Sequence, residues 1–250
     1  MSPEATDFLY PFIEGDETDS SSLLADLSRS AQSKWAQSTR LRAETLTLAE
    51  EQLRTVAAAM AERFAAGGRL YAFGNGGSAT DAEGVAQLYT RPPWGSALAA
   101  RSLSEDQAVL TALSNDIGFD VVFSRQLIAH GRPTDIAMGF STSGNSENLL
   151  MAFAEAAKQG MLTVGLSGYD GGRMATDPSL EHCIVVRSDS VHRIQESQAA
   201  VIHTLWAYVQ EAMPAGGFAD PGGAPTQSVR HGGGPPSSDA AGAPAPPPAV

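Results

Sequence analysis

Hydrophobic residues recur along this chain in two patterns, one typical of helices and one typical of short buried strands. Apolar positions at helical spacing predict two helices near the N-terminus, over residues 21–37 and 39–66, and the pair Gly67-Gly68 ends the second. The same spacing over residues 191–213 predicts a long, largely buried helix that closes the pattern.

Between these helices lie short apolar runs with the length of buried strands. They alternate with helical segments, which predicts an α/β fold with a parallel sheet covered by helices on both faces. In such folds the ligand crevice lies at the carboxyl ends of the strands. The predicted strands are residues 70–73, 97–103, 135–140, 162–166 and 183–187, and the helices between them are residues 79–88, 107–114, 121–129 and 147–159.

A glycine-rich turn, Gly74-Asn75-Gly76-Gly77-Ser78, joins the first predicted strand to the next helix. Its glycines allow a sharp turn and a close approach to a ligand, and Ser78 is predicted at the helix N-cap. A helix N-terminus presents free N–H groups and a positive dipole end, which suit a phosphate. Many such turns carry glycine only for geometry, so a purely structural role stays open.

A second turn of this kind, Ser141-Thr142-Ser143-Gly144-Asn145-Ser146, follows the strand predicted at residues 135–140. Its hydroxyl and backbone N–H groups at the start of a helix form a site for a phosphate dianion without a nearby lysine. Capping and turn chemistry alone would also explain the run of Ser and Thr. Two such turns in one parallel sheet favour the binding site.

Composition narrows the class of protein. The 250 residues are 42% hydrophobic and 18% charged, enough for one good core. The net charge of -12 and the lack of clustered Lys and Arg argue against nucleic-acid binding.

The single cysteine, Cys183, excludes an internal disulfide framework and fits a reducing cytoplasm, and we expect a cytoplasmic protein. No signal peptide or run of about 18 apolar residues is present, so no membrane association is expected.

Both ends of the chain differ from its centre. Residues 1–20 form an acidic arm around the apolar patch at residues 8–13, which either folds back on the protein or docks a protein partner. Residues 214–250 are rich in Gly, Pro and Ala and are predicted to be a disordered tail, either a passive tail or a proline-rich ligand for a partner. The folded domain, with its N-terminal helices, is therefore predicted at residues 21–213.

Several motifs together resemble the sugar-isomerase (SIS) domain of phosphoheptose isomerases. Besides the two turns, they are Ser114-Asn115-Asp116-Ile117-Gly118-Phe119, Tyr169-Asp170-Gly171-Gly172 and Arg193-Ile194-Gln195-Glu196, in this order along the chain. The resemblance covers about residues 46–213. It implies a flavodoxin-like three-layer sandwich, a homotetramer with active sites between subunits, and conversion of sedoheptulose 7-phosphate to a heptose 7-phosphate.

The resemblance also assigns binding roles to individual residues. It implies that the serine and threonine side chains hold the phosphate or substrate and that a second group lines the sugar site. The first group is Ser78, Ser141, Thr142, Ser143 and Ser146, and the second is Asn75, Gly76, Gly77, Asn115 and Asp116. Gln195 carries no charge and is predicted to contact a sugar hydroxyl.

The chain departs from the family at the metal site. In the family, a zinc-binding His lies six residues beyond the Ser of the first turn, and a Glu four residues later binds zinc and acts as the catalytic base; here these positions are Gly84 and Leu88. Only Gln195 and His203 remain of the four zinc ligands, so no metal cofactor is expected. His203 could still act on a proton during isomerisation, or serve only structurally.

Glu83 and Gln87 each lie one residue before a lost position. One step along a helix rotates a side chain by about 100°, so Glu83 could act as the base only with a slipped helix register. Two hypotheses follow from these departures. One is a protein that binds a sugar phosphate with lost or much reduced zinc-dependent isomerase activity. The other is an active isomerase with rearranged catalytic residues, and a tetrameric scaffold that binds a protein partner stays open beside them.

Overall fold

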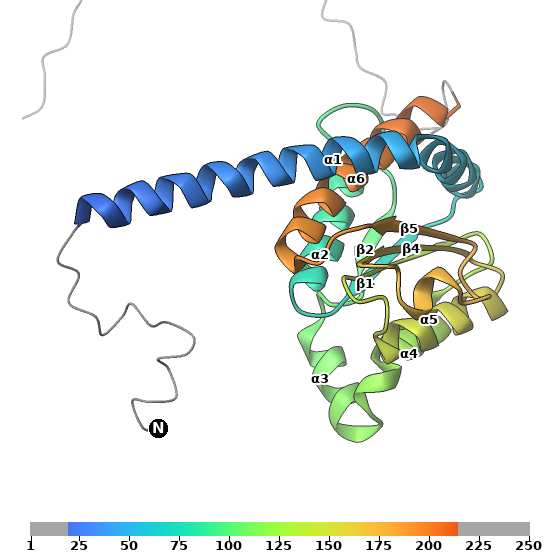
Figure 1. Cartoon of the computed structure of the whole chain (residues 1–250). Coiled ribbons are helices and arrows are strands. Elements are labelled where there is room, and N and C mark those ends of the chain that lie inside the picture. Colours follow the sequence, from blue (N-terminus) through green and yellow to red (C-terminus); the bar gives the residue numbers. More distant parts are fainter. Residues whose placement is uncertain (1–19, 215–250) are drawn as a thin grey trace, which may run out of the picture. The chain divides into compact units, whose positions relative to one another are not determined.

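The computed structural model describes residues 20–214. Most of the predicted acidic arm, including its apolar patch at residues 8–13, and the Gly/Pro-rich tail lie outside the described residues. Within them, strands and helices alternate as the hydrophobic pattern predicts (Figure 1). No helix among residues 20–214 is both long enough and apolar enough to cross a membrane.

Five parallel strands form one sheet in the order β2-β1-β3-β4-β5. Every residue of β1, β3 and β4 is buried, which explains their nearly continuous apolar sequence. The second strand is shorter than predicted, because only three of its residues pair with β1. The strands are β1 (Leu70–Gly74), β2 (Ala100–Ser102), β3 (Ile136–Ser141), β4 (Leu162–Gly168) and β5 (His182–Val186).

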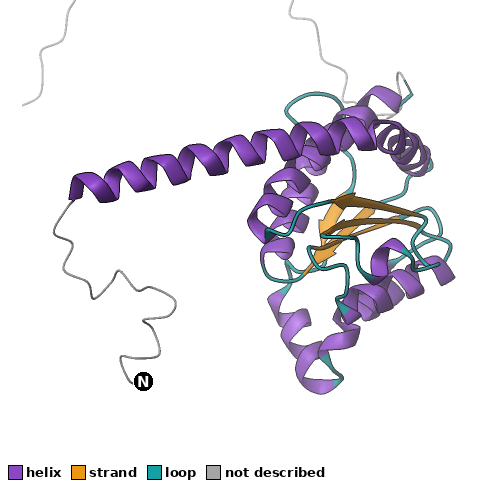
Figure 2. Ribbon diagram, in the orientation of Figure 1, coloured by secondary structure: helices purple, strands orange, loops and turns teal. Residues whose placement is uncertain are grey.

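Helices cover both faces of the sheet and so make three layers (Figure 2). Side chains alternate along each strand, so Leu70 and Ala72 pack under α1, α2 and α6, whereas Tyr71 and Phe73 pack under α4 and α5. This confirms the predicted sandwich. The helices are α1 (Ser20–Ala65), α2 (Gly77–Thr90), α3 (Gln107–Asp116), α4 (Val122–His130), α5 (Glu147–Lys158) and α6 (Val191–Ala212).

The first two predicted helices are in fact one. Helix α1 runs without a break through residue 38, where the sequence pattern places a boundary. The Ser38 hydroxyl donates to the Glu196 carboxylate on α6 and accepts from Arg193, so a polar residue in mid-helix has partners there. The prediction of two helices was wrong because these partners are distant in sequence.

The two predicted ligand turns lie on one edge of the sheet. Strands β1 and β3 are neighbours, with Gly74 in register with Phe140, so both turns leave the carboxyl ends of adjacent strands. The carboxyl ends of β3 and β4 are adjacent in the same way, with Ser141 in register with Ser167. This edge is therefore the place to look for a ligand site.

Candidate functional site

Three serine hydroxyls meet at the end of β3. The Ser141 hydroxyl lies 3.0 Å from that of Ser146 and 3.4 Å from that of Ser143, and it accepts from the Gly144 N–H at 3.2 Å. Ser146 is the N-cap residue of α5, but its hydroxyl caps no backbone N–H of that helix. These hydroxyls are thus gathered at a helix N-terminus, where an anion is stabilised.

Glycines let the turn of residues 141–146, here called the hydroxyl turn, pack closely against the turn after β4. A Cβ on Gly144, whose φ is +66°, would lie 2.0 Å from the carbonyl oxygen of Gly171. A Cβ on Gly172 would lie 2.3 Å from the carbonyl oxygen of Ser143, and the Met174 N–H donates to the Gly144 carbonyl at 2.9 Å. The glycine motif after β4 therefore serves the close packing of the two turns.

A hollow of about 530 Å³ opens beside the hydroxyl turn. Tyr169, at its wall, is exposed and has a φ of +52°, an unfavourable backbone conformation for a tyrosine of the kind found at functional sites. Two carboxylates also face the hollow and offer acceptors for hydroxyl donors of a ligand. The lining residues are Ser143, Asn145, Tyr169, Asp170, Ser188 and Asp189.

The glycine-rich turn after β1 brings the start of α2 to the same edge. Gly76, at φ +55°, occupies the N-cap position, and α2 begins at Gly77. The prediction that Ser78 is the N-cap was wrong, because Ser78 already belongs to the first turn of the helix, where it is buried. A conformation at positive φ suits glycine, which lacks a Cβ, so Gly76 and not Ser78 makes the turn.

An amide pair connects this turn to helix α5. The Asn75 and Asn148 side chains each donate to and accept from the other, at 2.9 Å in both directions. Asn148 is only 3% exposed, so this pair fixes Asn75 from inside the protein. Sequence analysis gave a binding role to Asn75 and none to Asn148. The only local signal at Asn148 is its position two residues after Ser146, in the first turn of a helix.

Gln195 reaches the glycine-rich turn from α6. Its amide nitrogen would lie 2.6 Å from a Cβ at Gly77, and it donates to a carboxylate oxygen of Asp81 at 3.3 Å. Partial burial raises the pKa of Asp81 above its ordinary range, and the hydrogen bond from Gln195 opposes this shift. Sequence reasoning missed Asp81, whose only local signal is its place one turn into the helix after the glycines.

Helical geometry separates Asp81 from Glu83. At about 100° per residue, Gly84 and Leu88 lie within about 60° of Asp81 around α2, whereas Glu83 lies about 160° away. Glu83 instead lines another hollow, with Ser102 and Glu105 at the β2 side of the helix. Gly84 and Leu88, where the chain departs from the family, therefore lie on the same side of α2 as Asp81. Asp81, and not Glu83, accepts a hydrogen bond from Gln195 on this side.

Of the remaining predicted residues, three lie outside the two turns and Thr142 lies within the second. His203 is exposed on α6, two turns beyond Gln195. Asn115 and Asp116 are exposed at the end of α3, where the Asn115 amide donates to the Asp116 carboxylate at 2.8 Å. Thr142 is half-buried, and its carbonyl accepts from the Gly168 N–H at 3.0 Å. The roles given to these four side chains by resemblance stay predictions.

The donor set at this site does not fit zinc. Zinc in proteins takes four N, S or O ligands, and the side chains of Gly84 and Leu88 supply none of these atoms. Gln195 could offer only its amide oxygen, and His203 is exposed two turns farther along α6. Among residues 20–214, no three His, Cys, Asp or Glu side chains are grouped as a metal site requires.

Comparison with known proteins agrees with this architecture. Residues 35–168 match the SIS domain family. A phosphoheptose isomerase from Paramagnetospirillum magneticum is 41% identical over 182 residues, 69% of this chain and 93% of that protein. One from Rhodospirillum rubrum is 43% identical over 154 residues, 59% of this chain and 79% of that protein.

The solved structures give the same result for the fold. The phosphoheptose isomerase from Neisseria gonorrhoeae superposes with a TM-score of 0.69 at 35% identity, over 74% of this chain and 99% of that one. The enzyme from Francisella tularensis gives the same TM-score at 28% identity, over 73% and 97%. The chain therefore belongs to the SIS domain family and, within it, resembles the phosphoheptose isomerases.

Proposed function

We propose that this protein binds a phosphorylated sugar at the edge of the sheet formed by the two turns. The observation that carries the proposal is the hydroxyl cluster of Ser141, Ser143 and Ser146 at the N-terminus of α5. Hydroxyl donors, free backbone N–H groups and a helix dipole together suit a phosphate group.

The adjoining hollow suits the sugar part of such a ligand. Asp170 and Asp189 can accept hydrogen bonds from sugar hydroxyls, and the Tyr169 ring offers an apolar surface beside them. Because curated relatives at about 40% identity are named phosphoheptose isomerases, we infer a heptose phosphate, with sedoheptulose 7-phosphate as the first ligand to test.

Calorimetry with sedoheptulose 7-phosphate tests the binding proposal. Changing Ser141→Ala together with Ser143→Ala should weaken binding by roughly 2–4 kcal/mol, at about 1–1.5 per neutral hydrogen bond and more for a charged acceptor. The control is Ser114→Ala, because that hydroxyl donates to the Leu110 carbonyl of its own helix. Absence of heat with both heptose and hexose phosphates would reduce the serines to structural caps.

We further propose that zinc-dependent isomerase activity is lost or much reduced. Isomerisation between aldose and ketose needs a base for the proton next to the carbonyl group. Leu88 cannot supply one at the position where the resemblance places the family's glutamate, and Gly84 cannot bind a metal. On this proposal the protein retains the ligand site of its family without the metal-dependent step.

The second candidate function is isomerase activity with a different base. It is favoured by one observation, the Asp81 carboxylate that faces Gln195 beside the glycine-rich turn. Burial raises the pKa of Asp81, and a carboxylate with a raised pKa is a better base. Glu83, the base expected from a slipped register, is less well placed, because it lines the hollow at the β2 side of α2.

A turnover assay with sedoheptulose 7-phosphate separates the two candidates. If the enzyme is active through Asp81, Asp81→Asn should reduce the rate by about 10²- to 10⁴-fold, as is typical for loss of a general base. The matched control is Glu83→Gln, which removes a carboxylate from the same helix and should leave the rate unchanged. If the first candidate holds, turnover by the unmodified protein should stay near background with or without added zinc.

Assembly is a separate part of the proposal. We infer a homotetramer, as the resemblance implies, because α1 leaves large apolar side chains exposed along its first half. A protein partner at the acidic arm remains a hypothesis about residues outside the described range. The exposed apolar residues are Leu23, Leu24, Leu27 and Trp35.

A further inference from the structure

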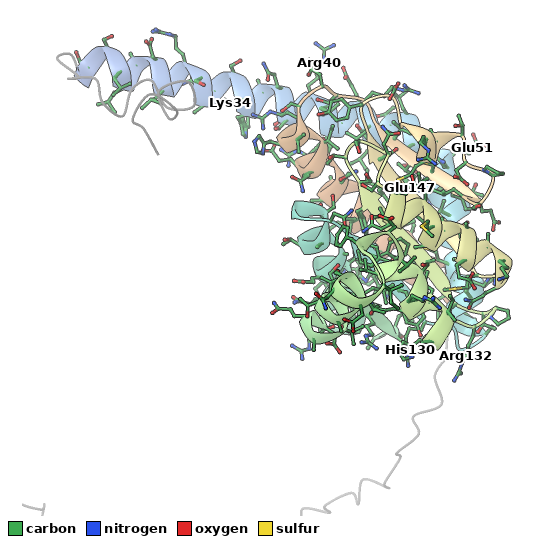
Figure 3. All side chains as sticks on the ribbon, turned by 90° about the horizontal axis from the view of Figure 1, so that it is seen from below. Lys34, Arg40, Glu51, His130, Arg132 and Glu147 are labelled. Atoms are coloured by element: carbon green, nitrogen blue, oxygen red, sulfur yellow. The ribbon has the colours of Figure 1, made fainter. Side chains whose placement is uncertain are left out.

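The edge of the sheet opposite the sugar site carries a second hollow. It has a volume of about 330 Å³ and opens where β1 and β3 begin. Arg69 and Arg132 line it together with His130, the last residue of α4. Figure 3 shows His130 and Arg132 side by side at this edge of the molecule. Two arginines and a histidine thus share one small depression in a chain whose net charge is -12.

A buried carboxylate holds the backbone of both arginines in place. Asp135 is only 3% exposed, and one of its oxygens accepts from the Arg69 N–H at 2.7 Å. The other accepts from the Arg132 N–H at 2.9 Å. The Ile136 N–H donates to the Arg69 carbonyl at 2.9 Å, so the two arginine backbones are linked to the start of the sheet.

The histidine of the hollow is fixed through its own backbone. The Tyr71 hydroxyl donates to the His130 carbonyl at 3.1 Å, and the Tyr71 ring is buried in the core. The arrangement is therefore built on β1, α4 and the loop before β3, and not on a single surface segment.

The guanidinium groups of this hollow are available to a ligand. Within residues 20–214, none of the ion pairs includes Arg69 or Arg132, and their hydrogen bonds to Asp135 come from the main chain. Asp135 is buried and its two oxygens accept from these main-chain N–H groups, whereas Arg69 and Arg132 themselves are exposed and line the hollow. Arginine presents a planar fork of donors that matches the oxygens of phosphate or sulfate.

We propose that this hollow, defined by Arg69, His130 and Arg132, binds a small anion that carries a phosphate or sulfate group. The site is distinct from the sugar site, because it lies at the amino ends of the strands and the serine turns lie at the carboxyl ends. Its volume fits a compact anion such as pyrophosphate better than a nucleotide, which adds a base and a sugar to its phosphates.

Titration with sodium pyrophosphate, followed by the imidazole signals of the histidines in NMR spectra, tests the proposal. The signal of His130, assigned through its loss in His130→Gln, should shift on titration. In Arg69→Gln with Arg132→Gln, the apparent affinity should fall at least 10-fold. This double variant should fold, since Asp135 binds the main chain at both positions, and its melting temperature checks this.

Two further variants make the result specific. Arg91→Gln removes an exposed arginine from the hollow at the β2 side of α2 and should leave pyrophosphate binding unchanged. Ser141→Ala with Ser143→Ala should weaken sugar-phosphate binding and leave the His130 shift unchanged. The proposal is overturned if 10 mM pyrophosphate leaves the His130 signal in place, if the arginine double variant binds as tightly as the native protein, or if the serine variant abolishes the shift.

Discussion

The side-chain amides of Asn75 and Asn148 bind each other in both directions and join the glycine-rich turn to the helix of the hydroxyl turn. This pair couples the two ligand turns, because Asn75 follows β1 directly and Asn148 lies two residues after Ser146. Its burial also shields it from competition by water, so both hydrogen bonds contribute to the stability of this edge.

Replacing the buried member of the pair should destabilise the protein. Asn148→Ala removes two hydrogen bonds and leaves the Asn75 amide without its partner, so the free energy of unfolding should fall by about 2–3 kcal/mol. Urea unfolding measures the change. Asn115→Ala is the control, because that exposed amide donates to its sequence neighbour Asp116, and its effect should stay within about 0.5 kcal/mol. Equal effects of the two variants would contradict the coupling role.

The missing metal ligands can be restored in the present backbone. A Cβ at Gly84 would meet no heavy atom within 4 Å, so there is open space where the side chain of Gly84→His begins. Leu88 packs against the core, so Leu88→Glu should lower stability as well as add a ligand. The unmodified protein should hold less than roughly 0.1 equivalent of zinc, and the double variant should hold more.

Metal content should rise in this double variant before activity does, because the surroundings that orient zinc ligands need not be present. Zinc analysis and a sedoheptulose 7-phosphate assay on the same sample give both values. Gly84→Ala with Leu88→Gln is the control for the change in packing and should bind no additional zinc. Robust, zinc-dependent turnover by the unmodified protein would contradict the prediction.

Local sequence signals predicted the strands and the turns after them. Strands β1 and β3 are apolar runs that end in glycine or serine turns, and both the pattern and the turn chemistry are contained within about ten residues. The parallel sheet followed from the alternation of such units, since each helix must return the chain to the same end of the sheet.

Long-range partners explain what the sequence did not show. Ser38 suggested a helix boundary, but its partner Glu196 lies 158 residues away and lets α1 continue. Asp81 is one of many acidic residues in the sequence, and only its approach to Gln195 marks it as part of the site. The structural role of Asp135 likewise becomes visible only in the fold, where its carboxylate accepts a hydrogen bond from the Arg69 N–H.

The first half of α1 should form a contact between subunits. Leu27 and Trp35 are 57% and 71% exposed in the single chain, although such side chains are usually covered in a stable assembly. Leu27→Glu with Trp35→Glu should therefore lower the mass that light scattering measures at micromolar concentration below that of the proposed tetramer. Lys34→Glu, at an exposed polar position of the same helix (Figure 3), is the control and should keep the tetramer.

The result also bears on the active-site arrangement implied by the resemblance. If the native protein is a monomer at micromolar concentration, the predicted sharing of the site between subunits fails. Asn115 and Asp116, at the exposed end of α3, could then not line a sugar site shared with a second subunit.

The partly buried carboxylate of Asp81 should affect how the stability of the protein depends on pH. Burial raises its pKa above the ordinary value of 3.8, so near that pH the folded protein binds its proton more tightly than the unfolded chain does. The free energy of unfolding should therefore decrease as pH rises from about 3.8 through the pKa of the folded state, and then level off with respect to this group.

Asp81→Asn removes this contribution, since an amide does not titrate. The stability of the variant relative to the native protein should increase across that pH window and stay constant above it, as measured by urea unfolding between about pH 3.5 and 7. Gln195→Leu deletes the hydrogen bond that lowers the pKa, so the window should extend to higher pH. A stability difference between Asp81→Asn and the native protein that stays constant from about pH 3.5 to 7 would contradict this prediction.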